Sequence, residues 1–130
     1  MSYIGTSIND SPVVYGQAGA ALTDPAFRAA AFDDDGNIVL VSTAGANALG
    51  LFIAEMPDVA AGDDVTVQIK ESGLWATGEA VAAGAELACD ADGKAVTAAS
   101  GNFIVGIALE AAAAADEIIK VQITKSGYKA

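Results

Sequence analysis

The sequence lacks the side chains from which most catalytic and metal sites are built. It has no histidine, which excludes Ser-His-Asp and Cys-His mechanisms as well as histidine-ligated metals. Its single cysteine, Cys89, lies in an apolar run that is typical of a buried, unreactive thiol. No glycine-rich phosphate loop is present, and most carboxylates fall in expected turns and strand ends, where solvation explains them. The sequence therefore predicts a protein that is not an enzyme and that uses no cofactor or metal.

Basic residues are scarce as well. The 130 residues include 6 Lys and Arg against 17 Asp and Glu, a formal net charge of −11. Binding to nucleic acid requires clustered basic residues that contact phosphates, so we expect no nucleic-acid partner. No apolar run approaches the length of a membrane span, and residues 1–5 do not resemble a signal peptide. We therefore expect no membrane partner and synthesis in the cytoplasm without an export signal.

Aromatic residues make up only 6% of a chain that is 53% apolar. A chain of this length forms one domain, but a core rich in alanine buries little area per residue. We therefore expect contacts with other copies to add to the stability. The single tryptophan, Trp75, and the tyrosine of the C-terminal tail, Tyr128, are candidates for oligomer or partner contacts, and Trp75 is also a candidate for the core.

The stretch from Gly78 to Ile123 consists of short apolar runs separated by Gly, Asp and Asn. Asp92-Gly93 lies between two of these runs and predicts a tight hairpin turn, because both residues tolerate a positive φ. The runs Phe103–Leu109 and Ile118–Ile123 predict two further strands. This stretch therefore reads as strand, turn, strand, loop, strand, loop, strand.

A looser copy of the same pattern precedes this stretch. The acidic turn Asp33–Asn37 corresponds to Asp90–Lys94, and Val65–Ile69 corresponds to Ile119–Ile123. Two copies are too few for a solenoid. We predict an all-β fold, a small barrel or β-clip-like structure built from two related β-units. The expected division is an extended arm and linker over residues 1–20, and a single β domain over residues 21–130 with an internal repeat at about 24–69 and 78–123.

Three segments allow more than one interpretation. Asp33 to Asp35 are acidic, but no acidic residue follows at the position that closes an EF-type calcium loop, so a hairpin turn is favoured. Asp24-Pro25 is compatible with the start of a short helix, whereas the repeat favours a strand over Phe27–Phe32. Ala111–Ala115 has high helix propensity, but the run is short and its counterpart contains Pro and Gly, so we expect a loop.

The N-terminal arm has isolated apolar side chains along a polar, turn-forming segment. Two interpretations are open: a frayed terminus, or a segment that becomes ordered on a neighbour by strand addition. Under the second interpretation, the candidate contact residues are Tyr3, Ile4, Ile8, Val13, Val14 and Tyr15.

The stretch 78–123, together with Val65–Ala76 before it, resembles a family of small phage capsid cement, or head decoration, proteins. The shared features are a Gly-Ala run, an acidic-Gly turn, a Thr/Ala-rich strand, a Gly-Asn-led apolar strand, an Ala-rich loop and a last strand. They lie at Ala83–Ala85, Asp92-Gly93, Val96–Ala99, Gly101–Ala108, Ala111–Ala115 and Val121–Ile123. Residues 1–20 have no counterpart in the family pattern.

The resemblance implies a structural virion protein on the outer surface of a phage capsid. It implies a homotrimer that binds the major capsid protein and clamps neighbouring subunits against the pressure of packaged DNA. Lambda-type decoration proteins, which are similar in plan, have a small β-clip-like fold and an N-terminal arm that contacts the shell. The alternatives are a ligand- or receptor-binding β module on a larger particle, with a pocket near Trp75, and a small hydrolase with a buried carboxylate pair.

Overall fold

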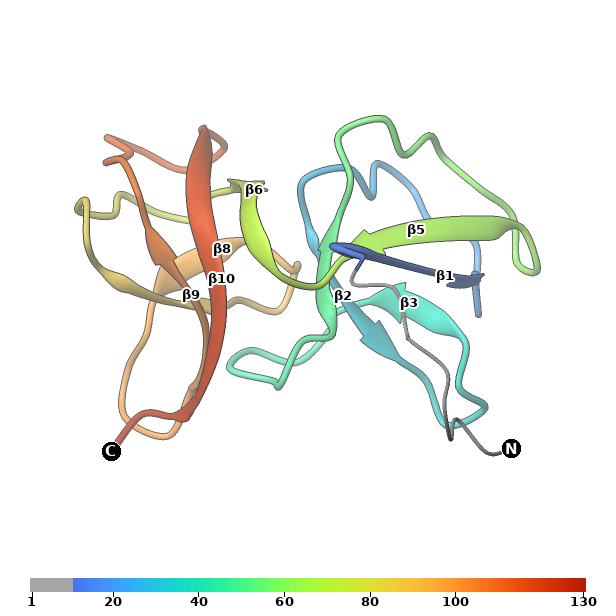
Figure 1. Ribbon diagram of the computed structural model, residues 1–130, viewed down its shortest axis with the longest axis horizontal. Helices are drawn as coiled ribbons and strands as arrows, with labels where there is room; N and C mark the ends of the chain where they lie inside the picture. The colour runs from blue at the N-terminus through green and yellow to red at the C-terminus, as the bar shows by residue number, and fades with distance from the viewer. Residues whose placement is uncertain (1–10) are drawn as a thin grey trace, which may run out of the picture.

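The computed structural model describes residues 11–130, and within them it contains ten β-strands and no helix. The strands form two five-stranded antiparallel sheets, one from each half of the chain. Figure 1 shows the two sheets side by side, and we call them unit 1 (residues 13–68) and unit 2 (residues 71–128). The all-β prediction is confirmed.

The two units have the same strand order. Across its sheet, unit 1 is ordered β1-β5-β4-β2-β3 and unit 2 is ordered β6-β10-β9-β7-β8. The strands of unit 1 are β1 (Val13–Gln17), β2 (Ala29–Phe32), β3 (Ile38–Leu40), β4 (Gly50–Phe52) and β5 (Asp64–Gln68). Those of unit 2 are β6 (Glu71–Ala76), β7 (Glu86–Cys89), β8 (Ala95–Thr97), β9 (Phe103–Ala108) and β10 (Ile118–Tyr128). Thus β6 takes the place of β1, and each later strand takes the place of its counterpart.

The acidic turns of the two units also have the same hydrogen bonds. The Asp33 carboxylate accepts from the N–H groups two and four residues later, both at 2.9 Å. The Asp90 carboxylate does the same in unit 2, again at 2.9 Å. In both turns a glycine with positive φ follows, Gly36 at 80° and Gly93 at 77°. Asp side chains of this kind replace backbone partners in tight turns, so the Asp33 carboxylate is engaged in the hairpin turn itself.

A closed barrel, one of the two forms expected, does not form among the described residues. Each sheet curls until the end of its first strand reaches its third strand through a single parallel bridge. The bridges join Ala18 to Ile38 in unit 1 and Thr77 to Ala95 in unit 2. One bridge is not a continuous ladder, so β1 and β6 remain edge strands of open sheets.

Backbone conformation explains why the segment after Pro25 is a turn that leads into β2, and not a helix. Asp24 and Phe27 have positive φ angles of 52° and 64°, which are incompatible with the first turn of a helix. Residues 26–27 form a turn, in which the Arg28 N–H donates to the Pro25 carbonyl at 3.1 Å, and the strand begins at Ala29 and not at Phe27. The alanine-rich segment 111–115 is a loop, as expected.

The larger hydrophobic core crosses the boundary between the units. It contains side chains of unit 1, including Ala29 and Leu51, together with Trp75, Leu87 and Val121 of unit 2. A second cluster lies within unit 1 around Ile38, Phe52, Val65 and Val67. Because one core takes side chains from both sheets, the two units pack as one body.

β1 occupies part of the segment that was expected to be an arm. It pairs with β5 from Val13 opposite Gln68 to Gln17 opposite Asp64. Val14 packs against the core of unit 1, and the next residue after the strand, Ala18, is buried. Residues 13–18 therefore belong to the first sheet, because their backbone pairs with β5 and the side chains of Val14 and Ala18 pack into its core. Residues 1–10 lie outside the described part of the chain.

Candidate interaction surfaces

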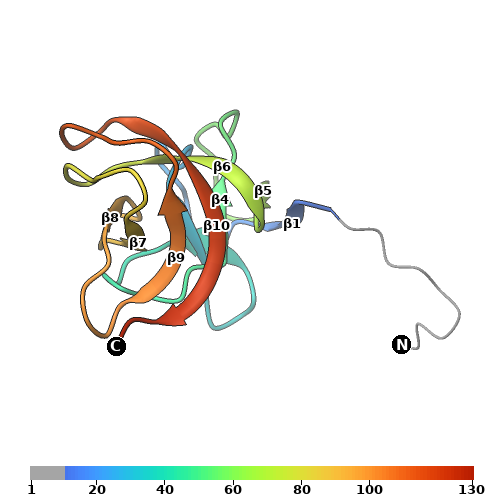
Figure 2. The same ribbon diagram turned by 60° about the vertical axis from the view of Figure 1, so that its left-hand side comes forward.

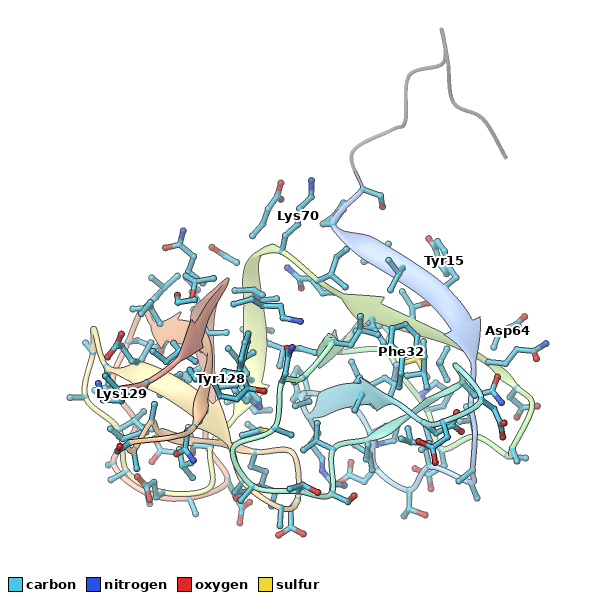
Figure 3. The ribbon with its side chains drawn as sticks, turned by 90° about the horizontal axis from the view of Figure 1, so that it is seen from below. Tyr15, Phe32, Asp64, Lys70, Tyr128 and Lys129 are labelled. Carbon is cyan, nitrogen blue, oxygen red and sulfur yellow. The ribbon has the colours of Figure 1, made fainter. Side chains whose placement is uncertain are left out.

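β1 combines an unpaired edge with an exposed aromatic side chain. One edge of β1 pairs with β5, and no other described strand pairs along its opposite edge. In Figure 2, β1 lies at the periphery of the molecule beside β5. Tyr15 on this strand is 77% exposed, and it projects away from the sheets in Figure 3. An edge strand of this kind can accept an added strand from another chain.

The six candidate contact residues of the N-terminal segment are placed differently. Tyr3, Ile4 and Ile8 lie outside the described residues. The other three lie in β1, where Val13 and Val14 are half-buried and only Tyr15 is exposed. Of the described candidates, Tyr15 is therefore the side chain with most of its surface available to a partner.

Trp75 is a core residue and not a surface contact. Its side chain is 0% exposed, and its Nε1–H donates to the carbonyl oxygen of Gly93 at 2.9 Å. Its assignment as an oligomer or ligand contact is corrected, because the ring fills the core that joins the units and presents no face to solvent. The expected ligand pocket around it has no surface on which to form.

Tyr128 lies on an exposed, lysine-bearing end of unit 2. The residue is 68% exposed, and its ring meets the Phe103 ring edge to face at a centroid distance of 5.1 Å. The Lys125 Nζ lies 5.6 Å from the centroid of the same Phe103 ring, and burial lowers the pKa of this amine. Lys129 Nζ pairs with Glu86 Oε1 at 2.6 Å. Figure 3 shows Tyr128 and Lys129 on unit 2, away from Tyr15.

Two surface features were not found from the sequence. Phe32, at the end of β2, is 57% exposed beside a hollow of about 450 Å³ that Asp33, Leu40 and Asn47 help to line. A groove of about 400 Å³ also lies where β4 approaches the edge strand β6, with Leu74 on one wall. Phe32 precedes the acidic turn of unit 1 at the position that Cys89 holds in unit 2. Comparison of these two positions in the repeat was the sequence signal that could have identified Phe32.

The described residues show no cluster of side chains suited to metal binding. Among residues 11–130, no group of three or more Cys, Asp or Glu side chains is placed to hold a metal ion. Cys89 Sγ lies 3.5 Å from the carbonyl oxygen of Ala46, and burial raises the pKa of the thiol above its ordinary value. Within the same residues, no helix with the length and apolarity of a membrane span is found.

The match to known families spans both units. Residues 16–123 match the family described as phage cement protein. The chain belongs to the phage cement protein family. It is therefore a structural protein associated with the phage capsid. No curated protein matches the chain.

A solved phage structure is similar in fold to this cement protein. The crystal structure of the head fiber gp8.5 N base in bacteriophage phi29 is similar to it with a TM-score of 0.60 and 20% sequence identity. The similarity covers 91% of this chain and 98% of that chain. At this identity the likeness shows a shared fold that includes both units.

Proposed function

We propose that this cement protein binds the outer surface of an assembled phage capsid and stabilises it by bridging copies of the major capsid protein. Membership of the phage cement family supports the proposal. The observation that carries it is the unpaired edge of β1, with Tyr15 projecting beside it.

The β1 edge suits an extended segment of a capsid subunit. Strand addition would satisfy backbone N–H and C=O groups along Val13–Gln17 that have no partner strand on that side. It would also bury Tyr15, and a buried tyrosine at the centre of an interface typically contributes about 2 kcal/mol. Residues 1–12 precede this strand directly and extend the candidate contact to Tyr3, Ile4 and Ile8.

The proposal includes a homotrimer that is made in the host cytoplasm and acts without catalysis. The core supports self-association, because it contains many alanines and few aromatic side chains. The net charge of −11 opposes binding to nucleic acid, so the partner is the protein shell and not the packaged genome.

Capsids that lack the cement protein provide the test. They are incubated with the intact chain, a variant lacking residues 2–10, or Tyr15→Ser, and bound protein is measured after sedimentation. We expect the intact chain to bind and to raise the temperature at which capsids rupture. Tyr15→Ser should weaken binding at least 10-fold, which corresponds to about 1.4 kcal/mol.

Leu109→Ser is the matched control, because Leu109 is 47% exposed on unit 2 and lies outside β1. This variant should bind capsids like the intact chain. Equal binding by Tyr15→Ser and the intact chain would reject the β1 contact. No binding by the intact chain would reject capsid decoration.

A ligand-binding module is the second candidate, and the groove of about 400 Å³ between the units favours it. Phe52 and Leu74 supply apolar walls there, while Gln68 and Lys120 supply polar groups. Saturable binding of a glycan or peptide on an array, abolished by Leu74→Asp, would support this candidate. Absence of saturable binding would reject it.

A further inference from the structure

The interface between the two units joins two different faces. Unit 1 contributes what we call the donor face, the segment 27–29 and the loop 43–46. Unit 2 contributes the turn face, residues 89–94 at the end of β7 and in the acidic turn. The backbone N–H groups of Ala29 and Gly45 donate to the carbonyls of Gly93 and Cys89 at 2.7 and 2.8 Å.

Strand pairing identifies the same two faces on the opposite units. Phe32 pairs with Ile38 as Cys89 pairs with Ala95, so residues 32–37 form the turn face of unit 1. Ala30 pairs with Gly50 as Leu87 pairs with Gly106. The donor face of unit 2 is therefore the segment 84–86 together with the loop 99–102.

The turn face of unit 1 is uncovered, although its counterpart is buried. Phe32 is 57% exposed, whereas Cys89 at the equivalent position is 1% exposed. A Cβ added to Gly93 would lie 3.1 Å from backbone atoms of Ala29, but one added to Gly36 would meet nothing within 4 Å. The turn face of unit 2 is thus covered by unit 1, whereas the turn face of unit 1 is left open.

The donor face of unit 2 is open at its two glycines, and it carries an ion pair in which Lys129 Nζ lies 2.6 Å from Glu86 Oε1. A Cβ added to Gly84 or Gly101 would meet nothing within 4 Å. The Gly101 N–H donates to the Lys129 carbonyl at 2.8 Å, whereas its counterpart Gly45 donates to unit 2. The C-terminal residues therefore lie at this face, and Lys129, whose side chain is 38% exposed, stands where a partner would approach.

We propose that the turn face of unit 1 binds the donor face of unit 2 in a second copy of the chain. The inference rests on the self-association included in the proposed function. Phe32 is the apolar anchor, and the acidic residues Asp33 to Asp35 face Lys129 of the next copy. In the contact within the chain, Arg28 of the donor face donates from Nε to the backbone carbonyl of Asp92 in the turn face at 2.8 Å.

Such a contact is heterologous, since each copy uses a different surface toward each neighbour. It either closes into a ring, as the proposed trimer requires, or continues as an open chain of copies. Closure into a ring leaves no turn face exposed. Burial in this contact accounts for the exposed phenylalanine next to three consecutive aspartates, because an exposed phenylalanine does not stabilise an isolated chain.

Phe32→Glu tests the anchor in analytical ultracentrifugation over a range of concentrations. We expect the intact chain to sediment as an oligomer and Phe32→Glu to raise the dissociation constant at least 10-fold. Leu109→Glu is the matched control, since it adds the same charge at a 47% exposed apolar position outside both faces. Unchanged thermal unfolding of the isolated chain at low concentration confirms that Phe32→Glu still folds.

A charge exchange tests the pairing of the two faces. Asp35→Lys and Lys129→Glu should each weaken self-association. The double variant should recover part of it, because each interface then again contains opposite charges, while the ion pair between Lys129 and Glu86 stays lost. A monomeric intact chain at all concentrations, or a Phe32→Glu variant as oligomeric as the intact chain, would overturn the inference. Capsid binding measured on the same samples separates this outcome from failure of the proposed function, which predicts the loss with Tyr15→Ser.

Discussion

The indole N–H of Trp75 donates a hydrogen bond of 2.9 Å to the carbonyl oxygen of Gly93. The same oxygen accepts a second hydrogen bond, of 2.7 Å, from the N–H of Ala29 in the other unit. One carbonyl group therefore links the edge strand β6, the acidic turn of unit 2 and the first residue of β2. All three residues are buried, so water cannot replace either hydrogen bond.

Trp75→Phe should lower the free energy of unfolding by about 2–4 kcal/mol, because it removes the indole donor and leaves a cavity in the shared core. Urea unfolding followed by far-ultraviolet circular dichroism measures the change. Tyr15→Phe is the control, since this exposed side chain should change the free energy of unfolding by less than about 0.5 kcal/mol. Equal stability of both variants would contradict the structural role given to Trp75.

The sequence was sufficient to predict the all-β class, the two acidic turns and the order of strands around them. It did not reveal that β1 and β6 are equivalent. Their aligned residues are the small Gly16 in β1 and the large Trp75 in β6. The neighbouring residues differ in the opposite way, with the large Ile38 in unit 1 and the small Ala95 in unit 2. A Cβ added to Gly16 would lie 2.7 Å from Ile38 Cδ1, so the isoleucine fills in unit 1 the space next to the edge strand. A comparison of residue patterns along the sequence does not detect such a compensating change in side-chain size on two strands.

The surfaces were harder to predict than the strands. The sequence identified Tyr15 as an exposed contact candidate, but its place on a sheet edge depends on pairing with β5, about fifty residues later in the chain. Trp75 and Phe32 show the same limit in opposite directions. Trp75 follows turn residues and Phe32 precedes them, each within an apolar run. Only the packing of one unit against the other decides that Trp75 is buried and Phe32 is exposed.

Gly50→Ala and Gly106→Ala should each destabilise the protein by about 2 kcal/mol or more. These equivalent glycines face the carbonyl oxygens of Gln68 and Gln122 on the neighbouring strands, and an added Cβ would collide with them. Thermal unfolding of each variant measures the effect. Gly36→Ala is the comparison, because its site is open and only its positive φ adds a cost of about 1 kcal/mol. A smaller loss at Gly50 than at Gly36 would show that the sheet adjusts easily.

Cys89 should resist thiol reagents in the native protein. Burial raises the pKa of its thiol, so the reactive thiolate is less populated than in an unfolded chain. Native protein at pH 8 should react with a disulfide reagent at least 10-fold more slowly than protein in urea. Rapid labelling without urea would contradict this, because it would require frequent opening of the interface between the units.

The same thiol gives a pH dependence of stability. A group whose pKa is raised in the folded state contributes stability that is complete below the pKa of the unfolded chain and is lost as the pH rises toward the folded value. The free energy of unfolding should therefore begin to fall as the pH rises through the ordinary thiol pKa. In Cys89→Ser this decrease should be smaller than in the intact chain. An identical decrease in both proteins would assign it to other groups.

Arg28→Met should loosen the contact between the units while keeping much of the apolar stem of the side chain. Arg28 donates from Nε to the Asp92 carbonyl at 2.8 Å and from Nη1 to the carbonyls of Thr23 and Asp24 at 3.2 Å each. Because the residue is partly exposed, water replaces some of these bonds, and we expect a loss of about 1–2 kcal/mol. Lys120→Met, on the exposed face of β10, is the control and should have little effect.

Hydrogen exchange distinguishes a local effect from a general one. The amide of Ala29, which bonds to Gly93, should exchange faster in Arg28→Met, while amides within β5 should not. Equal acceleration at both places would show that Arg28 stabilises the whole fold and not this contact.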